Sequence, residues 1–398
     1  MNRRLDSLVV KNYRQLKNIE IDFVGDINLI VGRNNSGKST LLEAIRLLAS
    51  RGSTDLMEEI LNEHGELQMS SNDFSDEATP EMSICNLFTG RRFPGKDGVS
   101  IYVGDIKKSQ FIQIEHVFQS VEMIERLIDG EQSTIRRLKK ITKNDREELQ
   151  EASDALEISA PGNSDLFSPI VKTTVISLTD LFNRRRFVNR VQNQSLLPWI
   201  AHSYVPSRAT TQDELADVWD DVVLTEAESY VLKAMRLIEP GTAGLAFIQG
   251  GRRSSRNFPN RTVAYERHAM LRMEHLEIPV PLQSMGDGMT RVLQLILNAL
   301  KAKNGFLLID EFENGLHYSV QEQVWRLIFE LASANQMQVF ATTHSDDCVR
   351  AFSTVATEHA LKGVLIKVER IDDEGDSVVS SVTEVELSSL VNSNMDVR

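Results

Sequence analysis

A glycine-rich segment near the N-terminus has the residue types and spacing needed to bind phosphate. It runs GRNNSGKST and matches the pattern G-x-x-x-x-G-K-[ST]. In such a loop, successive backbone N–H groups surround the phosphates, and the following helix directs its positive end at the anion. We predict that Lys38 reaches the β- and γ-phosphates, that the Ser39 hydroxyl is a ligand of Mg²⁺, and that Thr40 binds near the α-phosphate. The predicted nucleotide-binding residues of this loop are Gly32, Asn35, Gly37, Lys38, Ser39 and Thr40.

Two acidic residues end an apolar segment in GFLLIDEFENGLH. Beside a phosphate loop, Asp310 would hold Mg²⁺, directly or through water, and Glu311 would polarise the attacking water. The alternative is a solvated acidic turn. A metal is the stronger interpretation, because two adjacent carboxylates at a buried strand end are costly without a cation.

A histidine follows a second apolar segment in QVFATTHSDD. His344 stands where an imidazole could hydrogen-bond the γ-phosphate and report its presence. The alternative is a structural histidine after a strand. The phosphate loop and the acidic strand end favour the sensor.

The segment SMGDGM opens an apolar-periodic helix. Ser284, Gly286 and Gly288 could offer O–H and N–H donors at a second anion-binding helix N-terminus. A plain glycine turn with a helix N-cap is the alternative that the segment alone favours.

The surrounding pattern indicates the elements that position these residues. Residues 1–31 read as strands, and a helical pattern follows the phosphate loop. From about residue 290 onward, helical segments alternate with short apolar strands, which is typical of an α/β fold with a largely parallel sheet. Charged, irregular residues 120–200 are interpreted as a helical insertion. We expect ATPase segments at 1–119 and 201–360 and a C-terminal strand with a polar tail at 361–398.

Composition limits the function. The chain has 398 residues and a formal net charge of -13, which disfavours nucleic-acid binding by the molecule as a whole. No apolar run reaches membrane-spanning length, and the N-terminus does not resemble a signal peptide, so we expect a cytoplasmic protein without a membrane contact. The two cysteines, Cys85 and Cys348, are expected to be reduced thiols.

Three basic clusters contrast with this acidic background. Each is a solvated face or ion-pair donor, or alternatively a contact for nucleic-acid phosphates or an acidic partner. The clusters are Arg136, Arg137, Lys139 and Lys140; Arg184, Arg185 and Arg186; and Arg252, Arg253 and Arg256.

The order of these motifs resembles that of the ABC-type ATPases that include RecF and structural-maintenance-of-chromosomes proteins. The motifs are, in sequence, the phosphate loop, the Ser-x-Gly-Asp-Gly turn, LLIDEFENGLH and TTHS. The sequence is most similar to ATPases of the overcoming-lysogenization-defect kind and to AAA-family ATPase components of anti-phage systems such as Septu, Gabija and PARIS. The resemblance covers residues 1–50 and 200–350. It implies a P-loop fold of ABC type with a mixed sheet core, an antiparallel N-terminal part and an inserted helical region.

The resemblance also implies a composite site. Ser284, Gly286 and Gly288 would cap the γ-phosphate of ATP held by a second copy, so a homodimer or higher homo-oligomer is expected. The loop Glu313–His317 would lie at the interface between the two copies. A glutamine loop should lie near SYVPSR, which contains no glutamine, and Gln212 is the nearby candidate.

These expectations lead to a Mg²⁺·ATP-dependent ATPase in which ATP joins two copies and hydrolysis releases them. In the first hypothesis for its function, the dimer regulates a separately encoded effector, a nuclease, in anti-phage defence. Residues after His344 carry no acidic cluster of a toprim nuclease, so we expect any nuclease to be another chain. Two alternatives are a RecF-like ATPase that binds DNA directly and a scaffold that binds ATP with little turnover.

Overall fold

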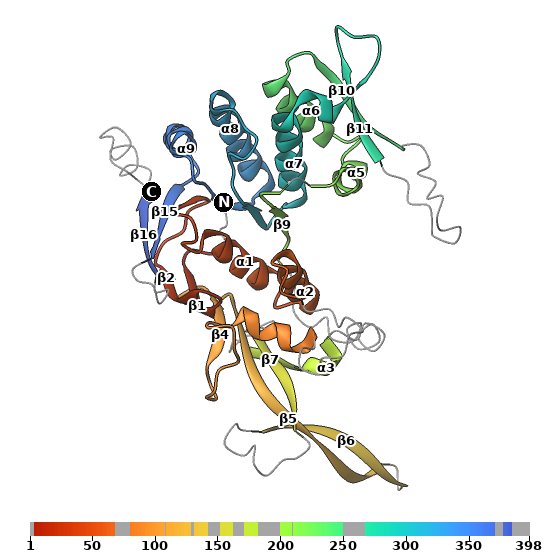
Figure 1. Cartoon of the computed structure of the whole chain (residues 1–398), viewed down its shortest axis with the longest axis vertical. Coiled ribbons are helices and arrows are strands. Elements are labelled where there is room, and N and C mark those ends of the chain that lie inside the picture. Colours follow the sequence, from red (N-terminus) through yellow and green to blue (C-terminus); the bar gives the residue numbers. More distant parts are fainter. Residues whose placement is uncertain are drawn as a thin grey trace.

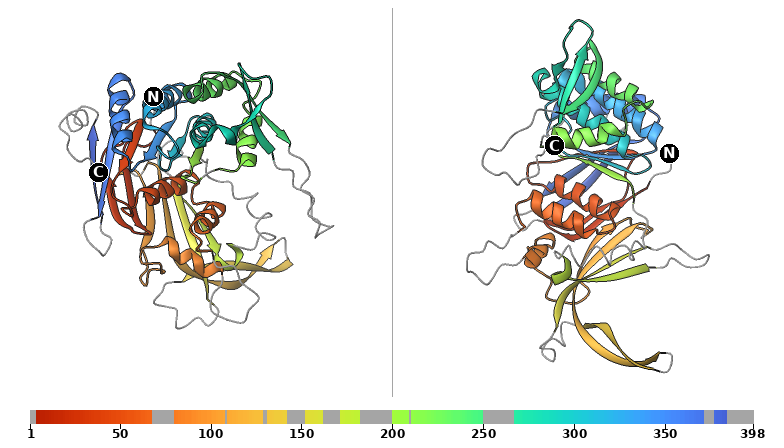
Figure 2. Two further views of the ribbon diagram at one scale, coloured as in Figure 1. Left: turned by 45° about the horizontal axis from the view of Figure 1, so that its top comes forward. Right: turned by 90° about the vertical axis from the view of Figure 1, so that its right-hand side faces the viewer.

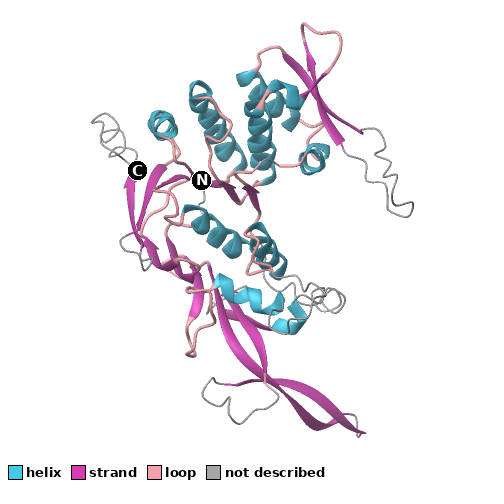
Figure 3. Cartoon of the chain, in the orientation of Figure 1, coloured by secondary structure: helices cyan, strands magenta, loops and turns pink. Residues whose placement is uncertain are grey.

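The computed structural model describes residues 4–67, 80–107, 109–128, 131–141, 152–161, 171–181, 200–208, 210–249, 267–370 and 377–383. These residues form a central sheet, an antiparallel sheet at one end of the molecule and a mostly helical lobe at the other (Figure 1). The same contrast between a strand-rich end and a helix-rich end is visible in Figure 3.

The central sheet is almost entirely parallel. Its order is β16-β15-β3-β14-β13-β9, and only β16 runs antiparallel to its neighbour. Every residue of β3, β13 and β14 is buried, as expected for strands covered on both faces. The strands are β3 (Ile27–Val31), β9 (His202–Val205), β13 (Phe306–Ile309), β14 (Gln338–Thr342), β15 (Gly363–Arg370) and β16 (Ser377–Thr383).

Helices cover both faces of this sheet (Figures 1 and 2). Alternation along β3 divides the core, because Ile27, Leu29 and Val31 join one hydrophobic cluster while Ile30 joins the other. The first cluster includes α7 (Asp287–Lys301), α8 (Tyr318–Asn335) and α9 (Asp346–Glu358), and the second includes α1 (Lys38–Ala49) and α2 (Thr54–Glu63).

The antiparallel sheet has the order β2-β1-β4-β5-β7-β8, with β6 paired to β5. It packs on α1, and the predicted strands of residues 1–31 are confirmed. Its elements are β1 (Leu8–Tyr13), β2 (Leu16–Ile21), β4 (Ser100–Gly104), β5 (Phe111–Ile128), β6 (Glu131–Ile141), β7 (Ser153–Pro161) and β8 (Val171–Ser177), with η1 (Pro80–Leu87) and α3 (Leu178–Leu181) alongside.

The helical insertion predicted for residues 120–200 is wrong for the part that the structure describes. β5 and β6 instead form a ribbon that projects from the molecule (Figure 1), and among the described residues of this span only the short α3 is helical. The pairing of Ile128 with Glu131 places an Asp-Gly dipeptide between the two strands, which is the strongest short hairpin signal in a sequence. The density of charged residues concealed that signal. Residues 142–151, 162–170 and 182–199 lie outside the description.

The helical lobe is inserted between β9 and α7. It contains α5 (Gln212–Asp220), α6 (Ala227–Ile238), β10 (Thr242–Gln249), β11 (Arg267–Met273), β12 (Val280–Pro281) and η3 (Leu282–Met285). A capping box between Thr211 and Glu214 starts α5. In the described residues, no helix has the length and hydropathy required to span a bilayer. Cys85 and Cys348 are free thiols.

Candidate functional site

The phosphate loop (Gly32–Thr40) connects β3 to α1, as its pattern predicts. Gly32 has φ 151° and Gly37 has φ 103°, conformations that side chains rarely adopt. A Cβ atom on Gly32 would lie 2.2 Å from the Val368 carbonyl oxygen, and one on Gly37 would lie 2.8 Å from Leu16 Cδ2. Both glycines are therefore required by backbone conformation and by close approach of neighbouring groups.

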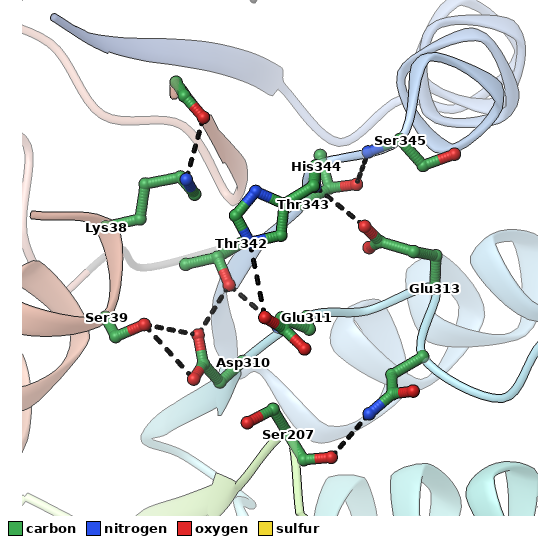
Figure 4. Close-up of polar contacts among 12 residues, drawn as sticks. Lys38, Ser39, Ser207, Asp310, Glu311, Glu313, Thr342, Thr343, His344 and Ser345 are labelled. Atoms are coloured by element: carbon green, nitrogen blue, oxygen red, sulfur yellow. Dashed lines mark hydrogen bonds and ion pairs between the residues drawn. The ribbon is translucent and has the colours of Figure 1, made fainter. Parts of the chain in front are cut away.

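Lys38 folds back over this loop. Its Nζ donates to the carbonyl oxygens of Gly32 at 2.8 Å and Arg33 at 2.9 Å (Figure 4). Burial lowers the pKa of Lys38, and the nearby carboxylates of Asp310, Glu311 and Glu313 oppose that shift. The loop thus carries a partly desolvated ammonium group.

Ser39 and Asp310 meet directly. Ser39 Oγ lies 2.9 Å from Asp310 Oδ1 and 3.2 Å from Oδ2, and Asp310 is 7% exposed. Thr342 Oγ1 donates to Asp310 Oδ1 at 2.7 Å and accepts from the Glu311 N–H at 2.8 Å (Figure 4). The three residues follow or end adjacent parallel strands, whose carboxyl ends share one edge of the sheet.

A hydroxyl next to a carboxylate fits the oxygen preference of Mg²⁺, which keeps several waters and binds few protein groups. No group of three or more His, Cys, Asp or Glu side chains able to hold a metal occurs among the described residues. The donor set therefore suits a cation shared with phosphate oxygens and water better than one enclosed by protein.

Glu311 has a left-handed backbone, with φ 50°. This conformation costs a non-glycine residue about 1–3 kcal/mol and is typical of functional sites. Its Oε1 lies 3.3 Å from His344 Nε2, and both side chains are more than one-third exposed. The His344 N–H donates to Glu313 Oε1 at 2.7 Å, which holds the histidine loop against the acidic strand end.

A cavity of about 750 Å³ lies beside the phosphate loop. Its size is within the usual range for ligand pockets. The phosphate loop, Glu311 and His344 form part of its wall. The remainder comes from residues that sequence reasoning missed, since they lie in turns and helix ends without a recognisable motif: Arg14, Gln15, His64, Asn86, Gly90 and Arg91.

A buried carboxylate organises this second wall. Glu43 on α1 accepts from Tyr13 Oη at 3.1 Å, and it pairs with Arg14 Nε at 3.1 Å and with His64 Nε2 at 2.6 Å. The hydrogen bond to Glu43 is the main cause of a raised pKa for His64. Glu66 joins Arg14 at 3.0 Å to Arg91 at 2.9 Å. The network fixes two guanidinium groups at the cavity.

The serine turn (Ser284–Gly288) does not line the cavity of its own chain. Ser284 is exposed and its Oγ donates to the Pro281 carbonyl oxygen at 2.7 Å. A Cβ on Gly288 would lie 3.0 Å from the Gly315 carbonyl oxygen, so this turn touches the ENGLH loop (Glu313–His317). The structure therefore brings Ser284, Gly286 and Gly288 beside that loop and not beside Lys38.

Other predicted contacts lie elsewhere. The Gln212 Oε1 accepts from the Ala269 N–H at 2.9 Å, so this amide is directed to β11 and does not line the cavity. In the basic cluster on β6, Lys140 pairs with Glu115 and Glu157. The side chains of the remaining cluster residues lie outside the description.

Comparison with known proteins supports a nucleotide-binding fold. The family model described as "AAA domain, putative AbiEii toxin, Type IV TA system" matches residues 27–348, and a second AAA-domain model matches residues 3–50. An "ATP/GTP phosphatase" of Helicobacter pylori is 27% identical over 367 residues, covering 89% of each chain. The "DNA replication and repair protein RecF" of Lactobacillus acidophilus is 49% identical over 45 residues, covering 11% of this chain and 12% of that protein.

Solved structures with a similar backbone trace include two heads of structural-maintenance-of-chromosomes (SMC) proteins. One is bound to the C-winged helix domain of ScpA, with TM-score 0.45, 13% identity and coverage of 96% and 98% of the two chains. The other is from Thermotoga maritima, with TM-score 0.40, 15% identity and coverage of 96% and 99%. The family match and the phosphate loop between β3 and α1 confirm the predicted α/β P-loop fold with a mixed sheet core.

Proposed function

The chain belongs to this AAA-domain family and is an ATPase of that family, and on this premise we propose that it hydrolyses Mg²⁺·ATP while two copies are joined by the nucleotide. The observation that carries the proposal is the contact of Ser39, which lines the cavity, with Asp310, 271 positions away in the sequence. The name of the Helicobacter relative, "ATP/GTP phosphatase", supports the proposal that this chain hydrolyses a nucleoside triphosphate.

Each residue has a defined task in this proposal. The phosphate loop cradles the phosphates, and the Lys38 ammonium moves from loop carbonyls to phosphate oxygens. Ser39 and Asp310 would hold Mg²⁺, which would supply neutralisation of the phosphate charge. Glu311 orients and polarises the attacking water, and His344, 3.3 Å from it, senses the γ-phosphate. Catalysis then consists of positioning and electrostatics.

The exposed serine turn supports a homodimer. The turn does not line the cavity of its own chain, it contacts the ENGLH loop at Gly315, and Ser284 is exposed, so the turn is accessible to ATP held by a second copy. A helix N-terminus with free N–H groups suits a terminal phosphate. We propose that Ser284, Gly286 and Gly288 close the partner's site.

Two variants test this mechanism of ATP hydrolysis and dimerisation. Glu311→Gln should reduce ATP turnover about 10²-fold or more while prolonging the ATP-held dimer, because binding survives and hydrolysis does not. Ser284→Arg should abolish ATP-dependent dimerisation measured by light scattering. Ser229→Arg is its matched control, since Ser229 is also exposed and its Oγ also donates to the carbonyl oxygen three residues earlier. If Glu311→Gln changes neither turnover nor the lifetime of the ATP-held dimer, the proposed mechanism fails and a scaffold with little turnover is favoured.

For the biological output, we propose that the ATP-held dimer controls a separately encoded effector, a nuclease, in anti-phage defence. The family description, which includes a putative AbiEii toxin and a Type IV TA system, supports an effector-linked role. The test is co-purification of this chain with the product of the adjacent open reading frame, with and without ATP. Absence of an ATP-dependent complex would reject this output.

The second candidate is a RecF-like ATPase that binds DNA directly. It is favoured by the 49% identity to RecF over 45 residues. Tight DNA binding by the isolated protein that weakens steeply with salt would support it, because phosphate contacts release counterions.

A further inference from the structure

One buried arginine contacts the backbone of the candidate catalytic strand end. Arg291 lies on α7 and is 5% exposed. Its NH2 donates to the carbonyl oxygens of Asp310 and Glu311, both at 2.7 Å. Its NH1 donates to the Pro206 carbonyl oxygen at 2.8 Å and to Gln294 Oε1 at 3.0 Å. Arg291 does not line the 750 Å³ cavity.

The two carbonyls that share one guanidinium nitrogen belong to the peptide groups on either side of Glu311. The orientation of these two peptide planes defines φ and ψ of Glu311, which has the left-handed φ of 50°. From the opposite side, Thr342 Oγ1 accepts from the Glu311 N–H at 2.8 Å. Such strained backbone persists only where surrounding contacts fix it. The described side-chain contacts that do so come from Arg291 and Thr342, and the Asn314 N–H also donates to the Glu311 carbonyl oxygen at 3.0 Å.

We propose that Arg291 is a positioning residue that fixes the left-handed backbone of Glu311 and thereby directs its carboxylate into the cavity beside His344. The inference rests on the proposed role of Glu311 in hydrolysis. Because Arg291 is on the helix that begins at the serine turn, it also links the position of α7 to the position of this carboxylate.

Lysine cannot reproduce this arrangement. The guanidinium is planar and offers five donors in a fixed fork, so it reaches the strand end and the Pro206 carbonyl together. A lysine ammonium is a single point charge on a flexible stem. The geometry therefore requires arginine and not simply a buried cation.

The test is a double-mutant cycle on the full chain. Arg291→Lys and Arg291→Met should lower kcat about tenfold and about 10²-fold respectively, the loss expected for a misplaced catalytic group. KM and the affinity for a fluorescent non-hydrolysable ATP analogue should stay within about twofold, because Arg291 does not itself line the cavity and reaches it only through the backbone carbonyl of Glu311. In the Glu311→Gln background, Arg291→Met should cause no further loss, since its effect passes through Glu311.

Arg326→Met is the matched control, because Arg326 is a partly exposed arginine on α8 paired with Glu322 and Glu358. If Arg291→Met does not fold, Arg291→Lys carries the cycle. Full kcat in Arg291→Lys, or losses that multiply with Glu311→Gln, would overturn the inference while leaving the ATPase proposal intact. Normal turnover in Glu311→Gln would instead overturn the proposed role of Glu311, on which this inference rests, and absence of ATP turnover in the wild-type protein would overturn the ATPase proposal.

Discussion

The Ser39 hydroxyl and the Asp310 carboxylate lie 2.9 Å apart, although 271 positions separate them in the sequence. One belongs to the loop after β3 and the other follows β13, with β14 between these strands. The contact exists because parallel strands deliver their carboxyl ends to one edge of a sheet. It converts two separate sequence motifs into one candidate metal-binding pair.

Replacing Lys38 should separate nucleotide binding from folding. In Lys38→Ala, the loop loses an ammonium group that caps two backbone carbonyls and that would contact phosphate. We expect ATP affinity to fall at least about tenfold, with a small change in melting temperature, since those carbonyls can bind water instead. Isothermal titration and thermal melts measure both. Lys233→Ala, which removes an exposed partner of Glu330, should leave ATP affinity unchanged.

Glycine is required at the start of α1. We expect Gly37→Ala to destabilise the protein by about 1–3 kcal/mol, because it adds a Cβ 2.8 Å from Leu16 Cδ2 and forces alanine to φ 103°. Chemical denaturation provides the measurement. Gly65→Ala separates the two causes, since it has φ 65° but no atom within 4 Å of the added Cβ. Equal losses in both variants would contradict a steric contribution at Gly37.

The hydroxyl group of Thr342 should contribute to both folding stability and turnover. Thr342→Val keeps the shape of the side chain but removes the donor to Asp310 and the acceptor for the Glu311 N–H. Leaving the Glu311 N–H without its acceptor and Asp310 Oδ1 with one donor fewer should cost about 1–3 kcal/mol of folding free energy and lower kcat. Thr342→Ser retains the hydroxyl and should restore most of both quantities. If valine and serine variants behave alike in denaturation and turnover, the hydrogen bonds are not the cause.

His64 should make stability depend on pH in one direction. Its folded-state pKa lies above the ordinary value of 6.5, mainly because of its hydrogen bond to Glu43. The pair therefore contributes fully below pH 6.5 and loses its contribution as pH rises through the raised pKa. Relative to wild type, His64→Gln should lower the melting temperature at about pH 6 and much less at about pH 9. A difference that does not vary with pH would exclude this mechanism.

The order of motifs predicted much of the central sheet and one wall of the site. Local patterns suffice for the phosphate loop and for Asp310, because each motif is contained in one strand and its following turn. Arg14 and Arg91 could not be found in this way, since turns without a pattern bring them to the cavity. Arg291 resembles any helical arginine until its contacts with two distant carbonyls are seen. The β5–β6 ribbon was missed because its charged residues outweighed an Asp-Gly signal.

The neighbours of β3 have a consequence for synthesis of the protein. The strand that carries the phosphate loop pairs on one side with β14 and on the other with β15, both of which lie far later in the sequence. While the ribosome has not yet passed Gln338, Ile27–Val31 has no sheet partner, and its second partner arrives only with Gly363–Arg370. A nascent or prematurely released polypeptide thus carries the glycine motif without a framework to hold it. The phosphate loop therefore gains its full sheet framework only after Gly363–Arg370 has been synthesised.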